Sequence, residues 1–211
     1  TGMLNRMVLY VTALMEVKSS MGIIVAAPTA GSCGALPGAC LAAGETMGWS
    51  DETIARGMLA AGLIGIFVTA RSSFAAEITG CQGETGVGAA MAAAALVDMN
   101  GGTVNQALAA ASMALQNTLG LVCDPVANRV EVPCLGRNIS AAANALTSAN
   151  VALADFAEVI PLDEVIATHN TIGRGLPREL RCTCLGGLSI TDSAKKIETQ
   201  LARNRLGDIG V

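Results

Sequence analysis

The stretch from Gly80 to Gly136 constrains the fold most strongly, because it alternates helix-like runs with turn-like points. Alanine and glycine dominate the run from about Glu84 to Met99, and alanine is the best helix former. Aromatic residues make up only 2% of the 211 residues, so the core must be built from Ala, Leu, Val, Ile and Met. Small side chains let helices approach one another closely. We therefore expect an all-α fold, formed by a single domain over residues 1–211.

Helical spacing of apolar residues and capping signals place the expected helices along the chain. Ser50 and Thr191 are each expected to cap a helix, and Thr103 with Gln106 has the pattern of a capping box for another. The run from Leu63 to Val68 is apolar on all sides, so the helix that contains it is expected to be central and enclosed by the others. The expected helices span approximately residues 4–21, 35–47, 51–71, 84–99, 103–120, 137–156, 161–171 and 191–203.

Charge and hydropathy argue against several classes of protein. The net charge is −4 and no basic tract exists, so we expect no nucleic-acid binding, since phosphate contacts need clustered Lys and Arg. The longest apolar run, from Met58 to Ala70, has 13 residues, whereas a membrane span needs about 20, so we expect no membrane segment. Arg6 and Glu16 interrupt any N-terminal signal pattern. Seven cysteines in so apolar a chain indicate reduced thiols in a cytoplasm.

Three cysteines, Cys81, Cys123 and Cys134, lie at turn-like points beside glycine or proline. Thiols on separate loops can converge on a shared point, and iron–sulfur clusters are held by cysteine thiolates, commonly four. A protein that offers only three leaves one iron open to water or substrate, as a Lewis acid requires. The spacing matches none of the compact iron–sulfur or zinc patterns, so buried structural cysteines are the alternative interpretation.

A small, glycine-rich loop from Thr29 to Gly34 precedes the helix expected at residues 35–47. Free amide groups at the start of a helix bind anions, so Thr29, Gly31 and Ser32 are candidates for holding a substrate carboxylate. An ordinary capping loop is the alternative for the same residues.

Two residues are candidates for a general base. Glu84 follows closely after Cys81, although it could equally be a charge at a helix N-terminus. His169 is the only histidine; a surface or core role is the alternative, and the base could also come from another chain. Arg178 could bind a carboxylate through two hydrogen bonds, or pair with a neighbouring acid.

The remaining cysteines are not expected to be ligands. Cys40 lies on an expected helix and reads as a core residue, and Cys33 is likewise set aside. Cys182 and Cys184 form a Cys-x-Cys pair that could offer a fourth ligand, but incidental thiols near the surface are the favoured interpretation.

Five runs of residues carry a resemblance to a known family. They resemble the α (catalytic) region of iron–sulfur-dependent L-serine dehydratase, fall in that family's order and cover nearly the whole chain. The resemblance places the three cluster ligands on Cys81, Cys123 and Cys134, and it implies that further residues precede Thr1 and that a β subunit helps to close the site. The runs are residues 27–34, 80–84, 123–126, 133–138 and 176–180.

The resemblance implies a mechanism for amino-acid catabolism that feeds gluconeogenesis. An open iron of a [4Fe-4S] cluster would bind the β-hydroxyl of L-serine and a base would remove the α-proton. Loss of water gives aminoacrylate, which tautomerises and hydrolyses to pyruvate and ammonia. The Thr29–Ser32 loop, Asn138 and Arg178 are the candidates for holding the substrate. None of the three lysines reads as a Schiff-base lysine, so no pyridoxal phosphate is expected.

Other functions remain open at the level of sequence. A related iron-dependent thiol eliminase would take cysteine as its substrate, in the manner of a cysteine desulfidase. An electron-transfer iron–sulfur protein would have four cysteine ligands and no response to substrate. A purely structural helical subunit would hold no metal. The low proportion of charged residues, 14%, also suggests that another subunit covers part of the surface, so an oligomer is expected.

Overall fold

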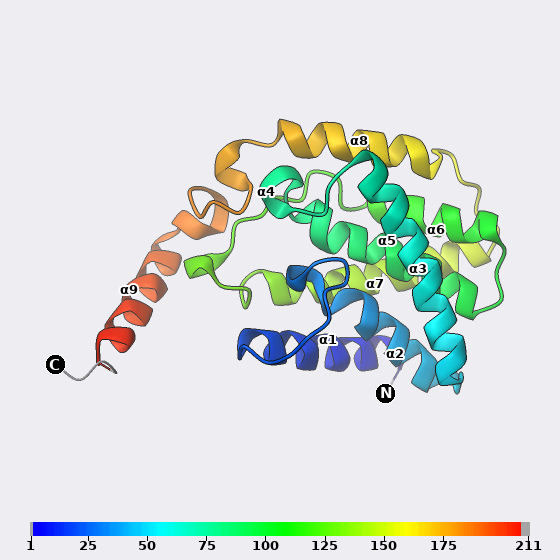
Figure 1. Cartoon of the computed structure of the whole chain (residues 1–211), viewed down its shortest axis with the longest axis horizontal. Helices are drawn as coiled ribbons and strands as arrows, with labels where there is room; N and C mark the ends of the chain where they lie inside the picture. The colour runs from blue at the N-terminus through cyan, green and yellow to red at the C-terminus, as the bar shows by residue number, and fades with distance from the viewer. Residues whose placement is uncertain (1, 208–211) are drawn as a thin grey trace.

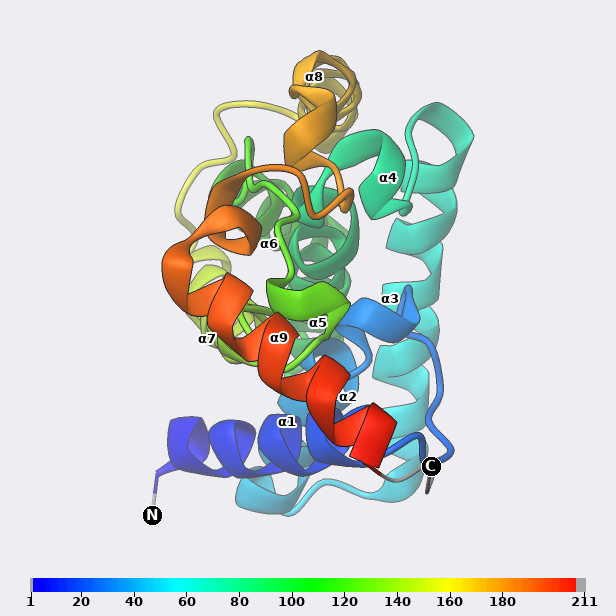
Figure 2. The same cartoon turned by 90° about the vertical axis from the view of Figure 1, so that its left-hand side faces the viewer.

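The structure is a computed structural model that describes the backbone of residues 2–207 and the side chains of residues 2–203. Within this part of the chain there are nine α-helices and no strand, which confirms the all-α fold (Figure 1). In both views α1 and α8 lie on opposite sides of the molecule (Figures 1 and 2), and Figure 1 shows that α9 leaves the body at one end. The helices are α1 (Met3–Ser19), α2 (Ala35–Met47), α3 (Asp51–Arg71), α4 (Ala76–Thr79), α5 (Val87–Met99), α6 (Val104–Gln116), α7 (Cys134–Leu153), α8 (Leu162–Gly175) and α9 (Asp192–Gly207).

The central apolar helix is α5. Every residue of α5 except Asp98 is buried, and α2, α3, α6 and α7 all pack against it. Its alanine and glycine residues let neighbouring backbones approach from all sides, which larger side chains would prevent. The fold is therefore a helical domain around a central apolar helix, as expected, but the placement of that helix at residues 51–71 is wrong.

Helix α3 packs on α5 with one face and leaves another face exposed. Leu59, Leu63 and Ile66 on its outer face are 73%, 55% and 61% exposed. The run from Leu63 to Val68 in α3 and nearly all of α5 are apolar on all sides in sequence, so periodicity alone does not distinguish the two helices. By length and composition alone α3 is also long and apolar enough to cross a membrane, a criterion that core helices of soluble proteins meet as well.

The predicted caps are present. The Ser50 hydroxyl accepts a hydrogen bond from the Thr53 amide at 3.2 Å, and the Thr191 hydroxyl accepts one from the Ala194 amide at 3.3 Å. Thr103 and Gln106 form the reciprocal capping box.

Several helix ends differ from those expected. Helix α7 begins at Cys134, so this thiol lies in the first turn rather than before it. Helix α8 continues beyond the expected end at residue 171, through Gly173, and ends at Gly175. A Cβ at Gly173 would lie 2.7 Å from the Cα of Thr79, so a glycine is needed where α8 crosses the turn before Cys81. Helix α6 ends at Gln116, and hydrogen-bonded turns continue to Leu121.

Candidate metal and substrate site

The turn that carries Cys81 is held from two sides by Gln82. Cys81 follows Gly80, whose φ of +73° places the turn where a Cβ would clash with the carbonyl of Leu121. The buried Gln82 side chain donates to the His169 carbonyl at 2.7 Å and accepts from the Gly120 amide at 2.8 Å. Since both polar ends of Gln82 are bonded, the backbone beside Cys81 is fixed to α8 and to the loop before Cys123.

Cys123 lies in a short extended segment that pairs with the chain beyond α8. It forms an isolated parallel bridge with Arg181. The Cys123 amide donates to the Leu180 carbonyl at 2.8 Å, and the Cys182 amide donates to the Cys123 carbonyl at 2.8 Å. This pairing brings Cys182, which was interpreted as an incidental surface thiol, to the side of a predicted ligand. Cys182 packs against the small buried group formed by Ala76, Cys81 and Cys123.

Asn138 connects the first turn of α7, which carries Cys134, to the Thr29 loop. Its side-chain amide donates to the carbonyls of Cys134 and Gly31, both at 2.9 Å, and its oxygen accepts from the amides of Gly34 and Ala35. Asn138 is fully buried, and its side-chain oxygen and nitrogen form these hydrogen bonds with other groups of the protein. Its contact with a substrate stays a prediction; what the structure shows is a positioning role.

The three predicted ligands influence one another's ionisation. A hydrogen bond with Cys123 lowers the pKa of the Cys81 thiol to about 7 against the effect of burial, and Thr85, whose hydroxyl lies 3.4 Å from the Cys81 sulfur, acts in the same direction. Cys123 is the shared donor, so its hydrogen bonds with Cys182 and Cys81 raise its own pKa. Burial raises the pKa of Cys134 to about 12, and the neighbouring charge of Cys81 adds to this.

Arg137 supplies the positive charge of this site and is not among the site residues predicted from the sequence. Its guanidinium donates to the Asp124 carboxylate and to the Val122 carbonyl, both at 2.8 Å. Burial opposes its charge, but the charge of Cys81 and the bond to Asp124 hold the pKa of Arg137 above its ordinary value. The spacing could have revealed it, because Arg137 stands three residues after Cys134 and therefore on the same helix face.

Glu84 and the Thr29 loop are brought together. The Thr29 hydroxyl donates to the Glu84 carboxylate at 2.8 Å, and a Cβ at Gly31 would lie 2.7 Å from the same carboxylate. Burial raises the pKa of Glu84, although the hydrogen bond from Thr29 acts against this. Ser32 is fully buried, and its hydroxyl bonds within the loop, to the Ala27 carbonyl among others. The loop therefore packs against Glu84, and the predicted role of Thr29, Gly31 and Ser32 in holding a substrate carboxylate stays a prediction.

Within the described part of the chain, His169 and Arg178 form no side-chain hydrogen bond or ion pair with the three predicted cysteine ligands, Arg137 or Glu84. His169 is fully buried on α8, where Nδ1 forms a hydrogen bond with the Ser72 hydroxyl at 2.8 Å, and Nε2 has no partner among the described residues. Burial lowers the pKa of His169. Arg178 is exposed and takes part in none of the ion pairs between described residues. Their predicted roles as base and carboxylate partner stay predictions.

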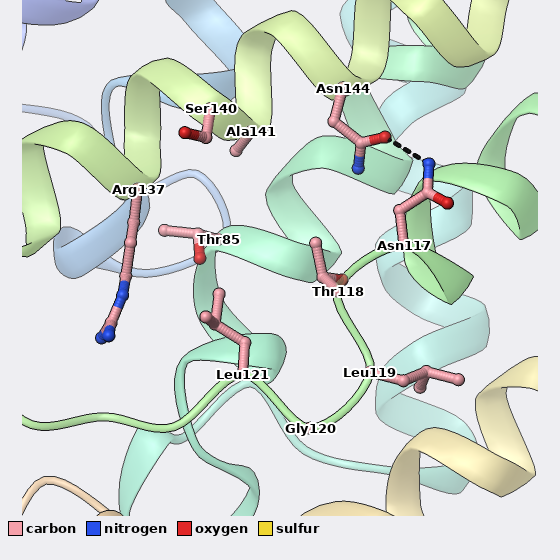
Figure 3. Close-up of a pocket in the computed structure, with 10 residues that line it drawn as sticks. All are labelled: Thr85, Asn117, Thr118, Leu119, Gly120, Leu121, Arg137, Ser140, Ala141 and Asn144. Carbon is pink, nitrogen blue, oxygen red and sulfur yellow. Dashed lines mark hydrogen bonds between the residues drawn. The ribbon is translucent and has the colours of Figure 1, made fainter. Parts of the chain in front are cut away.

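A cavity of about 580 Å³ lies beside Thr85 and Arg137 (Figure 3). Thr85 and Arg137, which both interact with Cys81, line it, so the cavity adjoins the first predicted ligand. Asn117 and Asn144 close part of the wall through a hydrogen bond of 2.7 Å. The rest of its lining is uncharged and comprises Thr118, Leu119, Gly120, Leu121, Ser140 and Ala141. A cavity with hydroxyls, amides and one cation suits a small polar molecule that carries a carboxylate.

The donor set fits a cluster better than a single ion. Within residues 2–203, no three His, Cys, Asp or Glu side chains are placed to hold one metal ion together. In an iron–sulfur cluster each thiolate binds a different iron, so the ligands surround the cluster and need not converge on one point. Cys81 and Cys123 share one buried group, and Cys134 lies within electrostatic reach of Cys81. Three thiolates are suitable ligands for an iron–sulfur cluster, and the neighbouring Arg137 offsets part of their negative charge.

Comparisons with known proteins agree with the resemblance of the five runs. Residues 1–189 match the family described as Serine dehydratase alpha chain. The chain is 48% identical to the L-serine dehydratase, alpha chain of Peptoniphilus asaccharolyticus, over 86% of this chain and 62% of that protein. It is 46% identical to the probable L-serine dehydratase, alpha chain of Latilactobacillus sakei, over 90% of each protein.

Other relatives are longer than this chain. The match covers 65% of the probable L-serine dehydratase, alpha chain of Bacillus subtilis (strain 168), at 44% identity. It covers only 40% of L-serine dehydratase TdcG of Escherichia coli (strain K12), at 40% identity. The chain thus spans less than two thirds of several of the relatives that it matches. From the family match over residues 1–189 and these identities, the chain belongs to the serine dehydratase alpha chain family.

Proposed function

We propose that this chain is the α part of an L-serine dehydratase, that it holds a [4Fe-4S] cluster on Cys81, Cys123 and Cys134, and that it forms pyruvate and ammonia from L-serine. The observation that carries the proposal is the grouping of Cys81, Cys123 and Arg137 beside a polar cavity, with Cys134 in the adjoining first turn of α7. When bound, the cluster supplies an open iron that acts as a Lewis acid on the hydroxyl of the substrate. The proposal involves no pyridoxal phosphate.

The residues of the chain orient the site. Gln82 and Asn138, both fully buried and bonded at both ends, hold the backbone beside Cys81 and Cys134. Arg137 balances thiolate charge and faces the cavity, where a carboxylate would meet it. Glu84, with its raised pKa, is the candidate base nearest in sequence to Cys81, and its neighbours Thr29 and Gly31 fix its position.

A partner chain belongs to the proposal. The relatives named alpha chain imply a second chain, and the longer relatives named simply L-serine dehydratase extend well beyond the matched segment. The exposed apolar side chains of α3 support an oligomer in which another surface covers them. All seven cysteines are free, in keeping with a reducing cytoplasm as the place of action.

The test is anaerobic reconstitution with iron and sulfide, followed by spectra recorded before and after the addition of L-serine. We expect a four-iron cluster whose spectrum changes with L-serine. Replacement of Cys134 by Ser should abolish the four-iron spectrum, whereas Cys40→Ala should keep it. Cys40 is the matched control because it is equally buried, in the α2 core, and has no thiol neighbour there.

The alternatives give different results. A cluster that responds to L-cysteine and not to L-serine would identify a thiol eliminase. An intact four-iron cluster that ignores both amino acids, with or without the β chain, would identify an electron carrier. No cluster in the wild-type chain, with every thiol still titrating and the helicity unchanged, would refute the metal site.

A further inference from the structure

Cys182 stands out because nothing in the proposed reaction uses it. It is half-buried and packs against the group that contains Cys81 and Cys123. Cys123 is only 3% exposed, so of the two thiols Cys182 is the one that a small molecule in solution can reach. The second cysteine of the pair, Cys184, points elsewhere and contacts the carbonyl of Pro125 and the side chain of Asn128.

The backbone places Cys182 and Cys123 side by side. The amide of Cys182 donates to the carbonyl of Cys123 at 2.8 Å, across the bridge between Cys123 and Arg181. Arg181 lies opposite Cys123 in this bridge, and Cys182 is the next residue along the chain. Paired extended segments lie about 4.8 Å apart and rise about 3.3 Å per residue, so regular spacing puts the Cα atoms of Cys123 and Cys182 about 5.8 Å apart, within the range of about 4.4–6.8 Å that a disulfide needs. The backbone spacing therefore suits a disulfide without a large movement of either segment.

The conformation of Cys182 turns its side chain toward Cys123. In a regular strand successive side chains point to opposite faces, so Cys182 would face away from the side that Arg181 and Cys123 share. Cys182 instead has a φ of +59°, in the left-handed region of backbone conformation that residues other than glycine rarely adopt. This breaks the alternation and lets the thiol contact the buried group.

We propose that Cys123 and Cys182 form a reversible dithiol–disulfide pair, with low-molecular-weight disulfides as the oxidant. The Cys182 thiolate attacks one sulfur of the small disulfide and releases one thiol. The Cys123 thiolate then attacks the Cys182 sulfur, which breaks the mixed disulfide and releases the second thiol. Overall, two protein thiols and one small disulfide give one protein disulfide and two small thiols.

The pair would control access of iron to the site. While Cys123 is bound to Cys182 it cannot serve as a metal ligand, so the oxidised chain would hold the site closed until a thiol reductant reopens it. This consequence rests on the proposed cluster. The formation of the disulfide rests only on the two thiols and can be tested in metal-free protein.

The experiment uses the full chain, purified without oxygen, stripped of metal with a chelator and incubated with oxidised glutathione. Free thiols are then counted under denaturing conditions, and cross-linked peptides are identified by mass spectrometry after cleavage before aspartate. Cleavage before Asp98 and Asp124 separates Cys123 from Cys81. We expect the thiol count to fall from seven to five and peptide 98–123 to be linked to peptide 163–191.

Matched variants assign the link. Cys184→Ser should keep the cross-link, and Cys182→Ser should lose it while retaining the helical circular dichroism of the wild type; Cys182→Ala is the second variant if the serine form does not fold. A disulfide from Cys123 to Cys81 or to Cys184 would overturn the proposed pair. So would a Cys182 that forms only a mixed disulfide with glutathione. If the link forms but the reduced chain still takes up no cluster, the pair stands and the proposed function fails.

Discussion

Arg137 and Asp124 form the most buried ion pair among the described residues, with side chains 16% and 5% exposed. Asp124 also accepts a hydrogen bond from the Leu188 amide at 2.8 Å, so the pair connects α7 to the turn after Arg181. The removal of one partner of a buried pair leaves an uncompensated charge, which is more costly than removal of both.

We therefore expect Arg137→Gln to lower the free energy of unfolding of the metal-free chain by about 3 kcal/mol. The double variant Arg137→Gln, Asp124→Asn should recover a substantial part of that loss, because no buried charge is left alone. Urea denaturation of the wild type, both single variants and the double variant measures the coupling. Additive effects of the two substitutions would contradict this account.

His169 is the only histidine of the chain, and comparison of the wild type with His169→Gln separates its pH dependence from that of other groups, such as the Cys81 thiol. Burial lowers the pKa of His169 in the folded protein. The unfolded chain therefore takes up a proton at a higher pH than the folded one. The contribution of the neutral His169 ring to the free energy of unfolding is fully present above its pKa in the unfolded chain, about 6.5. It is lost as pH falls from there toward the pKa of His169 in the folded chain.

We expect the unfolding free energy of the wild type to fall between pH 7.5 and 5.5, with a slope of at most about 1.4 kcal/mol per pH unit from this one proton. His169→Gln should be less stable at pH 7.5, since it loses the bond to Ser72, and should show a flatter slope. Urea midpoints at several pH values measure both, and the imidazole NMR signal reports the folded pKa directly. An unchanged slope in the variant would show that the ring is not responsible.

At the scale of the element, the sequence predicts local features well and tertiary ones poorly. The caps at Ser50 and Thr103 depend on residues three positions apart, and both are present. The periodicity of apolar residues does not show that α5, rather than α3, is the central helix. Side-chain size decides this, because the other helices can surround only the helix with the smaller side chains. The bridge that brings Cys182 to Cys123 joins distant segments, so no spacing in the sequence reveals it.

The difference between the two helices predicts opposite responses to substitution. Ala93 is fully buried on α5, so Ala93→Leu should destabilise the chain by about 1–3 kcal/mol through overpacking. Leu63 on α3 is 55% exposed, so Leu63→Ala should change the stability of the isolated chain by no more than about 0.5 kcal/mol. Urea denaturation of both variants measures this. Equal losses would mean that the two helices are enclosed to the same degree.

At the scale of the whole molecule, the site draws on separate segments of the fold. The turn before α5, the segment between α6 and α7, and the first turn of α7 supply the three predicted ligands, and the central helix α5 starts directly after the turn that carries Cys81. The cavity opens beside them and is not enclosed by the described residues alone. A reaction that must exclude water needs a further surface over such a cavity.

The chain alone should therefore bind a cluster but turn over L-serine poorly. Addition of the β chain should raise pyruvate formation on the order of 100-fold, because small errors in the placement of a substrate cost rates of that size. The measurement is pyruvate formed anaerobically by the reconstituted chain with and without the β chain, with Cys134→Ser plus the β chain as the control for iron-dependent turnover. Full activity of the wild-type chain alone would show that residues 1–211 close the site themselves, and activity of the Cys134→Ser mixture would show that the turnover does not come from this metal site.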